Sequence, residues 1–203
     1  MPNSHEHFAV YADLVLKNRS YRRFYENEII SMETLEELAG LGRIVPSTAN
    51  SQAIKLMLIN SPSENAKVFD TLGWAGMLAD WDGPEAGERP SAYIILLGDL
   101  SLGKNKFMDD GIIAQTMLLG AVSKGYGGCM LGNIKRTQLA SSLNIDLEKY
   151  SIDLVIALGK PKEEVVLEDI TALHGNRYYR DENQVHHVPK RTLEELITYK
   201  SGL

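Results

Sequence analysis

Residues 18–24 read Asn18-Arg19-Ser20-Tyr21-Arg22-Arg23-Phe24 and place three arginines within five positions. The chain around them has 203 residues and a formal net charge of −6, so this local positive charge runs against the overall balance. Arginine presents a planar fork of donors that matches the oxygens of a phosphate or carboxylate in pairs. We therefore interpret the stretch as an anion-binding segment. The alternative is a solvated basic turn at the end of a helix.

Helices and strands alternate along the rest of the chain. Upstream, apolar residues at helical spacing predict a helix over residues 6–17. Further helices are expected after Ser31, after Ser63 as far as about Leu72, from Asp109 or Asp110 to Ser123, after Thr137, and after the capping box Thr192-Leu193-Glu194-Glu195. Apolar runs predict strands over residues 55–60, 92–97 and 152–158. The alternation indicates a layered α/β or α+β domain.

The last part of the chain differs from the rest. Residues 160–190 are polar and show no clear period, which is unusual inside a compact domain. We interpret this segment as the start of an arm, about residues 160–203, that wraps a second subunit. This interpretation predicts a homodimer of chains that each form a single domain over residues 1–203.

Composition narrows the function classes. The apolar fraction of 44% and the charged fraction of 24% are ordinary for a soluble globular protein. A pI near 5.4 argues against a general nucleic-acid or membrane-surface binder, which would need a positive face. No apolar run is long enough to span a membrane, and the N-terminus does not resemble a signal peptide. With a single cysteine, Cys129, we expect a cytoplasmic protein.

Two glycine-containing stretches invite a nucleotide-binding interpretation. Residues 98–105, Gly98-Asp99-Leu100-Ser101-Leu102-Gly103-Lys104-Asn105, nearly match a P-loop, but an asparagine stands where a hydroxyl must reach magnesium. Residues 125–132 read Gly125-Tyr126-Gly127-Gly128-Cys129-Met130-Leu131-Gly132 and lack the third glycine of a dinucleotide fingerprint. The second stretch is either a helix cap and turn or a place where the backbone approaches a flat ligand. The five histidines do not share a metal-ligand spacing, so no metal site is expected.

Residues 46–52, Pro46-Ser47-Thr48-Ala49-Asn50-Ser51-Gln52, carry a run of hydroxyls and amides just before a predicted buried strand. Polar groups that enter a core must find hydrogen-bond partners. The edge of a ligand with mixed donors and acceptors, such as a flavin, would supply them. The alternative is a turn that is satisfied by its own backbone.

In this order and spacing, residues 19–24, 46–52 and 125–132, together with Pro189-Lys190-Arg191, resemble the nitroreductase family of FMN-dependent oxidoreductases. The resemblance spans about residues 8–200. It implies an α+β fold with a mixed central sheet flanked by helices, and a homodimer with exchanged arms and FMN at its interface.

The resemblance also implies roles for individual residues. The FMN phosphate would be held by Arg19, Ser20 and Arg22 and closed over by Lys190 and Arg191. The polar side of the flavin would meet Ser47, Asn50 and Gln52, and its ring would lie against Leu131 and Gly132, with a backbone N–H near N5.

The implied activity is hydride transfer from NAD(P)H to a small-molecule acceptor, such as a nitroaromatic or a quinone, by a ping-pong mechanism. The flavin carries the chemistry, so no catalytic side chain is assigned. Three alternatives stay open: a flavin-binding carrier or sensor without turnover, a flavin enzyme of the same fold acting on a halogenated or ene compound, and a magnesium-dependent nucleotide hydrolase built on residues 98–105.

Overall fold

The computed structural model describes residues 4–78, 80–102 and 108–202. The chain forms two compact units, which we describe separately. The main unit comprises residues 1–74 and 83–162, and the arm unit comprises residues 75–82 and 163–203. The boundary after Lys162 falls close to the start of the expected arm. That the two units act as one domain, and that the arm reaches a partner chain, stay predictions.

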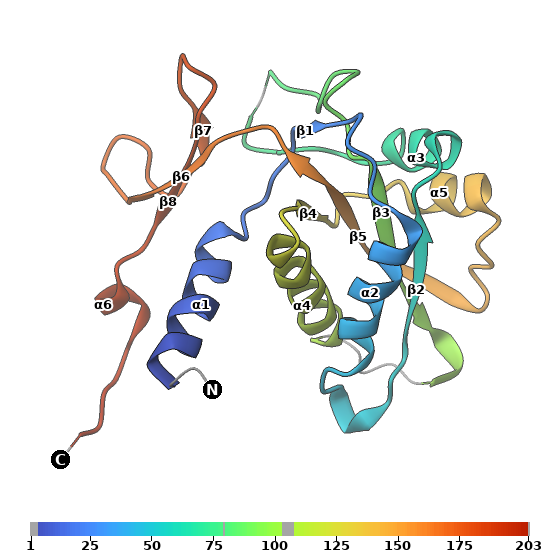
Figure 1. The fold of residues 1–203 in the computed structure, drawn as a ribbon, viewed down its shortest axis with the longest axis horizontal. Coiled ribbons are helices and arrows are strands. Elements are labelled where there is room, and N and C mark those ends of the chain that lie inside the picture. Colours follow the sequence, from blue (N-terminus) through green and yellow to red (C-terminus); the bar gives the residue numbers. More distant parts are fainter. Residues whose placement is uncertain (1–3, 79, 103–107, 203) are drawn as a thin grey trace. The chain divides into compact units, whose positions relative to one another are not determined.

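A five-stranded sheet forms the centre of the main unit (Figure 1). Its strands are β1 (Phe24–Tyr25), β2 (Ile54–Ile59), β3 (Ala92–Asp99), β4 (Gly127–Leu131) and β5 (Tyr150–Pro161). The path is β1-β5-β3-β2, and β4 pairs with β5 beside β1. Every ladder between these strands is antiparallel, and an isolated parallel bridge joins Ser20 to Gly128. The predicted α+β class is confirmed, although parallel pairing in this sheet is limited to that bridge.

The helices of the main unit are α1 (Ser4–Lys17), α2 (Met32–Arg43), α3 (Pro62–Phe69), α4 (Asp109–Ser123) and α5 (Arg136–Leu143), with short 3₁₀ turns at Thr48–Asn50 and Leu100–Leu102. Ser31 caps α2 as predicted, because its side chain accepts the Thr34 amide. The predicted caps of α3 and α5 are wrong. Ser61 precedes α3, since Pro62 fits the first helical position, and Lys135 precedes α5.

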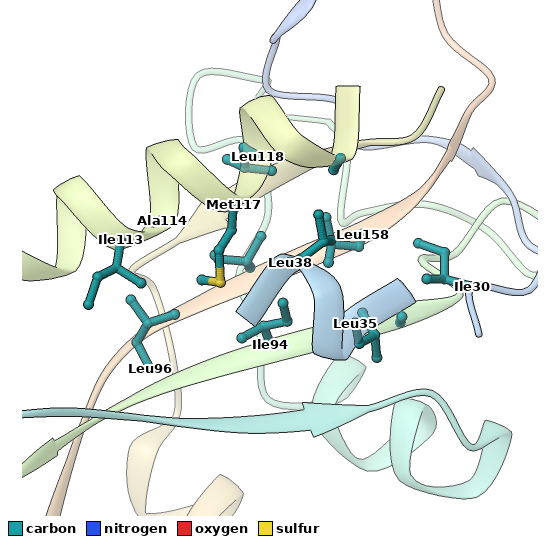
Figure 2. Close-up of a cluster of buried hydrophobic side chains, with 13 residues drawn as sticks. Ile30, Leu35, Leu38, Ile94, Leu96, Ile113, Ala114, Met117, Leu118 and Leu158 are labelled. Atoms are coloured by element: carbon teal, nitrogen blue, oxygen red, sulfur yellow. The ribbon is translucent and has the colours of Figure 1, made fainter. Parts of the chain in front are cut away.

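The core lies between the sheet and the helices α2 and α4. Alternate residues of β3 point to one face, where Ile94 and Leu96 meet Leu38 of α2 and Met117 of α4 (Figure 2). The opposite face of β3 carries Tyr93, and α3 lies on that side. Burial of these aliphatic side chains is the main force that holds the main unit together.

By contrast, α1 contributes no buried residue to the core of its own chain. Of the apolar residues that predicted this helix, Phe8 and Tyr11 are exposed, with Phe8 73% accessible, whereas Leu14 and Val15 are half-buried. Exposed apolar side chains on one helix are typical of a surface that another protein covers.

The arm unit is more regular than the sequence suggests. It contains β6 (Val165–Asp169), β7 (Tyr179–Arg180), β8 (His186–Lys190) and the four-residue helix α6 (Leu193–Leu196). β8 is the middle strand of a three-stranded sheet, parallel to β6 and antiparallel to β7. Within this unit Arg180 forms a buried ion pair with Glu163 at 3.0 Å and lies over the Trp81 ring. The expectation of an irregular segment is therefore wrong, because strand pairing replaces the missing sequence period. The capping box at Thr192 is confirmed.

Within the described residues, no helix is long and apolar enough to cross a membrane.

Candidate functional site

The arginine segment (residues 18–24) and the glycine-rich stretch (residues 125–132) lie side by side. Ser20 forms a bridge to Gly128, and the Tyr21 amide donates to the Gly128 carbonyl at 3.1 Å. A Cβ atom on Gly127 would lie only 2.5 Å from Cδ2 of Tyr21, so a larger residue could not stand there without displacing this ring. Of the two interpretations of residues 125–132, the helix cap and turn is wrong for most of the stretch, because Gly127–Leu131 forms β4. The glycines serve a close approach of two backbone segments.

The three arginines have different partners. Arg19 donates from Nη2 to the Val15 carbonyl at 2.6 Å, at the end of α1, while its Nε is buried and has no hydrogen-bond partner among the residues that the structure describes. Arg22 donates to the Ser20 carbonyl at 3.2 Å. Arg23 is neutralised by Glu88 of its own chain through both carboxylate oxygens. Arg19 therefore retains a buried donor that suits an external anion.

Glu88 fixes the end of the arginine segment. Its carboxylate also pairs with Lys162 at 2.9 Å, and its backbone carbonyl accepts the Phe24 amide at 2.9 Å. The hydrogen bonds from Arg23, and after them the hydrogen bond from Lys162, outweigh the effect of burial and lower the pKa of Glu88 from 4.5 to about 2. Sequence reasoning missed this residue, since Glu88 lies in a loop and its partner is 65 positions away.

The polar stretch before β2 is held largely by its own chain. The Ser47 hydroxyl accepts the Gln52 amide at 3.2 Å, as the turn interpretation expects. Both the amide and the hydroxyl of Thr48 donate to Oδ1 of Asp109 at 2.9 Å. Asn50 and Gln52 have φ angles of 52° and 49°, a left-handed conformation that is costly for residues other than glycine. Their side chains are exposed, so they are free to face a ligand.

Asp109 is a second residue that sequence reasoning did not assign to the site. It was expected only as the start of a helix, yet it is 1% exposed and supports the loop over residues 46–52. Together with Ser47, Gln52 and Lys55 it lines a cavity of about 390 Å³. An acidic residue in the first turn of a strongly apolar helix was the available signal, but nothing local indicated its partner.

Two of the predicted motifs lie at opposite edges of the sheet. Residues 46–52 lead into the edge strand β2, whereas the glycine-rich stretch forms β4 at the other edge, with β5 and β3 between them. Three strand spacings separate β4 from β2, which is about 14 Å. One chain therefore brings Arg19, Ser20 and Arg22 to the glycine-rich stretch, and it leaves Ser47, Asn50 and Gln52 apart from them.

The two residues expected against a flavin ring differ in what they offer. Leu131 is 5% exposed, so its side chain belongs to the core. Gly132 is exposed, and a Cβ atom built on it would meet nothing within 4 Å. The end of β4 is therefore open to a flat molecule.

The basic residues of the arm unit are exposed. Lys190 ends β8, and Arg191 pairs with Glu195 at 3.6 Å on the surface. Because the two units are described separately, the approach of Lys190 and Arg191 to the Arg19 segment stays a prediction.

The P-loop alternative gains no support from its described part. Gly98 and Asp99 end β3, a 3₁₀ turn follows at Leu100–Leu102, and the Ser101 hydroxyl is bound to Asp99 at 2.6 Å. Residues 103–105 lie outside the described part of the chain. The described residues also contain no group of three or more His, Cys, Asp or Glu that would hold a metal ion.

Comparison with known proteins identifies the family of the chain. The model of the nitroreductase family matches residues 15–160. A Bacillus subtilis (strain 168) protein named as an NAD(P)H nitroreductase, YodC, is 24% identical over 177 residues, which cover 72% of this chain and 87% of that protein. A Cr(VI) reductase from Pseudomonas sp. (strain G-1) is also 24% identical, over 179 residues that cover 81% of this chain and 74% of the relative.

Among solved structures, a protein from Desulfovibrio desulfuricans that was crystallised in complex with FMN superimposes with a TM-score of 0.68. The match covers 100% of both chains at 20% sequence identity, so it supports the fold. The family model covers most of the main unit, including the arginine segment, the loop before β2 and the glycine-rich strand. This chain therefore belongs to the nitroreductase family.

Proposed function

We propose that the chain is an FMN-dependent oxidoreductase that transfers hydride from NAD(P)H to an organic acceptor, such as a nitroaromatic or a quinone, by a ping-pong mechanism. Family membership supports this proposal, and so do an NAD(P)H nitroreductase among the named relatives and FMN in a structure of the same fold. When bound, the flavin would accept hydride in one half-reaction and release it in the next. The protein itself would bind, orient and exclude water, and we assign no catalytic side chain.

The residues present fit the phosphate end of FMN. The observation that carries the proposal is the buried Nε of Arg19, which has no partner within the described part of the chain, on a segment joined to β4 through Gly128. A phosphate oxygen would satisfy this donor in a charge-assisted hydrogen bond. We propose that Ser20 and Arg22 complete the phosphate site and that Lys190 and Arg191 close it.

The open end of β4 fits the ring of FMN. Gly132 leaves room for a flat molecule against the backbone, and its N–H would donate to the flavin where negative charge develops on reduction. We propose that Ser47, Asn50 and Gln52 meet the polar side of the flavin, and that Leu131 contributes its backbone alone.

Absorption spectroscopy of the purified protein tests the cofactor assignment. We expect flavin bands and the release of FMN on heating. Arg19→Ala should lose at least about tenfold in FMN affinity, which is the loss expected for one charge-assisted hydrogen bond. Arg177→Ala, which removes an exposed arginine of the arm unit, is the matched control. A protein that neither contains nor binds FMN would refute the assignment, as would equal affinity in both variants.

Turnover needs a separate measurement. We expect steady oxidation of NADH or NADPH only when a nitroaromatic or a quinone is added to the flavin-loaded protein. Flavin binding without acceptor-dependent oxidation would favour the carrier or sensor. Oxidation with an ene compound or a halogenated compound, but with neither of these acceptors, would move the enzyme to another substrate class.

We also propose a homodimer with sites shared between subunits. The motifs at opposite edges of the sheet form one site if residues 46–52 of one chain face the arginine segment and β4 of the other chain. The exposed apolar side chains of α1 supply a surface for such an interface, with Phe8, Val10 and Leu16 each at least 60% accessible.

Subunit mixing distinguishes shared sites from sites within one chain. One variant would carry Arg19→Ala with Arg22→Ala, and the other Asn50→Ala with Gln52→Ala. After co-refolding, shared sites should restore about a quarter of the wild-type FMN sites, because half of the dimers are mixed and each mixed dimer has one intact site. No recovery in a confirmed mixture of dimers would place each site in one chain.

A further inference from the structure

A second cavity lies apart from the proposed flavin residues. It occupies about 210 Å³ between α3 and the segment that leads into β3, on the face of the sheet opposite to α2 and α4. None of the ten residues assigned to the flavin lines it. Its volume is below the 300–1,000 Å³ that is usual for drug-sized ligands. It is therefore suited to a small molecule, or to a few waters.

Four of the residues that line this cavity each have a buried polar atom without a hydrogen-bond partner in the described part of the chain. These atoms are Oδ1 of Asn65, Nε of Arg89, Oγ of Ser91 and the hydroxyl oxygen of Tyr93. Ser91 is 4% exposed and Tyr93 is fully buried. Buried polar atoms in native proteins almost always have partners, so four such atoms around one cavity indicate an occupant that supplies them.

The existing hydrogen bonds and the protonation of these groups decide which of them donate and which accept a hydrogen bond from a ligand. Asn65 donates its amide N–H to the Ser91 carbonyl at 2.8 Å, which leaves its oxygen as an acceptor. Burial raises the pKa of Tyr93 well above its usual range, so the phenol stays protonated and donates. The cavity therefore presents Arg89 and two hydroxyls as donors, and Asn65 as an acceptor.

The charge of the cavity suits a single anionic group. The Arg89 guanidinium lies 4.1 Å above the Phe69 ring, and no carboxylate among the described residues forms an ion pair with it. Glu26 also lines the cavity and accepts the Arg89 amide at 3.2 Å. Because no carboxylate of the described residues pairs with it, the Arg89 guanidinium can balance one negative charge of a ligand, and the Glu26 carboxylate disfavours a second charge such as that of phosphate.

We propose that this cavity binds a small monocarboxylate that also carries a hydroxyl or an amino group. The carboxylate accepts hydrogen bonds from Arg89, Ser91 and Tyr93, and the second group donates to Oδ1 of Asn65. The carbon skeleton lies against the apolar part of the wall, which includes Phe69. The site is independent of the proposed flavin chemistry, since all of its residues lie elsewhere in the main unit.

Three small molecules separate the two recognition elements in the wild-type protein. L-lactate has the carboxylate and the hydroxyl, propionate lacks the hydroxyl, and propane-1,2-diol lacks the carboxylate. Titration followed by saturation-transfer NMR on the methyl group should show lactate binding at least about tenfold more tightly than either analogue, because each analogue leaves a buried group of the wall unpaired. Equal affinity of all three, or no lactate binding up to about 20 mM, would overturn the proposal.

Variants locate the binding. Arg89→Met keeps a side chain that can lie on Phe69 and removes the charge, and it should weaken lactate binding at least about tenfold. Lys67→Met removes an exposed cation of α3 outside the cavity and should leave binding unchanged. Equal losses in both variants, or none in Arg89→Met, would overturn the proposal. A crystal structure with lactate, which does not depend on the variants, should show it on Arg89 and Tyr93. Density for water alone would overturn the site.

Discussion

Glu88→Gln tests the ion pairs with Arg23 and Lys162 that hold the end of the arginine segment in place. The substitution keeps the size of the side chain and removes the charge that Arg23 and Lys162 share. The pKa of Glu88 is lowered from 4.5 to about 2, which at about 1.36 kcal/mol per pKa unit gives an upper bound of about 3.4 kcal/mol at neutral pH. Lys162 is 39% exposed, and solvent screens such pairs, so we expect a loss of about 1–2 kcal/mol.

This loss should be visible in thermal unfolding. For a chain of this size it corresponds to a fall of roughly 3–6 °C in Tm at pH 7. Because the folded-state pKa of Glu88 lies below the unfolded-state value, the ion pairs stabilise the protein fully above about pH 4.5. That contribution disappears as the pH falls toward 2. The difference between wild type and Glu88→Gln should therefore be largest at pH 7 and should shrink below about pH 4.

Glu85→Gln is the matched control, because it removes an exposed carboxylate three residues away in the same loop. It should leave Tm unchanged. The reasoning is refuted if Glu88→Gln melts with the wild type at pH 7, if the control loses as much, or if the difference persists undiminished in acid.

Three further outcomes test other parts of the structure. Gly128→Ala should lower the free energy of unfolding by about 1–3 kcal/mol or more and should lower the FMN content, because its Cβ atom would meet the backbone of β5. The control Gly40→Ala, on the open side of α2, should be neutral or stabilising in chemical denaturation. Arg180→Met should destabilise the arm unit by about 3–5 kcal/mol, because it removes the cation that forms the ion pair with the buried Glu163 carboxylate. Limited proteolysis of the arm unit no faster than in the wild type would contradict this. Asp109→Ala should speed amide hydrogen exchange over residues 48–52, because it removes the acceptor of the Thr48 amide. Asp109→Asn keeps an acceptor oxygen and should restore most of the protection. Identical exchange in both variants would show that the hydrogen bond between Thr48 and Asp109 is unimportant.

Much of the secondary structure was predictable from local sequence. The cap of α2 at Ser31 and the capping box at Thr192 follow from hydrogen bonds within one helical turn, and the start of α4 at Asp109 was expected from an acidic residue at the head of an apolar run. The strands β2, β3 and β5 were recognisable because continuous apolar runs leave few alternatives, although β2, which was predicted to be buried, is an edge strand and only its last residue, Ile59, is fully buried. Where local signals misled, as at Ser63 and Thr137, a neighbouring residue made the better helix start.

The candidate site was predictable in its composition and less so in its assembly. The order of the four short motifs was sufficient to indicate the family, which the match over residues 15–160 confirms. Sequence reasoning grouped all ten residues at one site, whereas one chain places the loop before β2 and the strand β4 at opposite edges of the sheet. Strand order depends on pairing between distant segments, and no local pattern encodes it.

The sequence by itself determined the periodic elements, the apolar core and the family motifs, because each depends on side chains close together along the chain. The tertiary structure decided which charges are neutralised and which backbones meet. The sequence places Arg23 in an apparent anion-binding segment, but in the structure Glu88, 65 positions away, neutralises its charge. Gly127 and Gly128 form a strand, which their own propensity disfavours, because β5 pairs with them. Tyr21 occupies the space where a Cβ atom of Gly127 would lie, and the Ala157 carbonyl occupies it for Gly128.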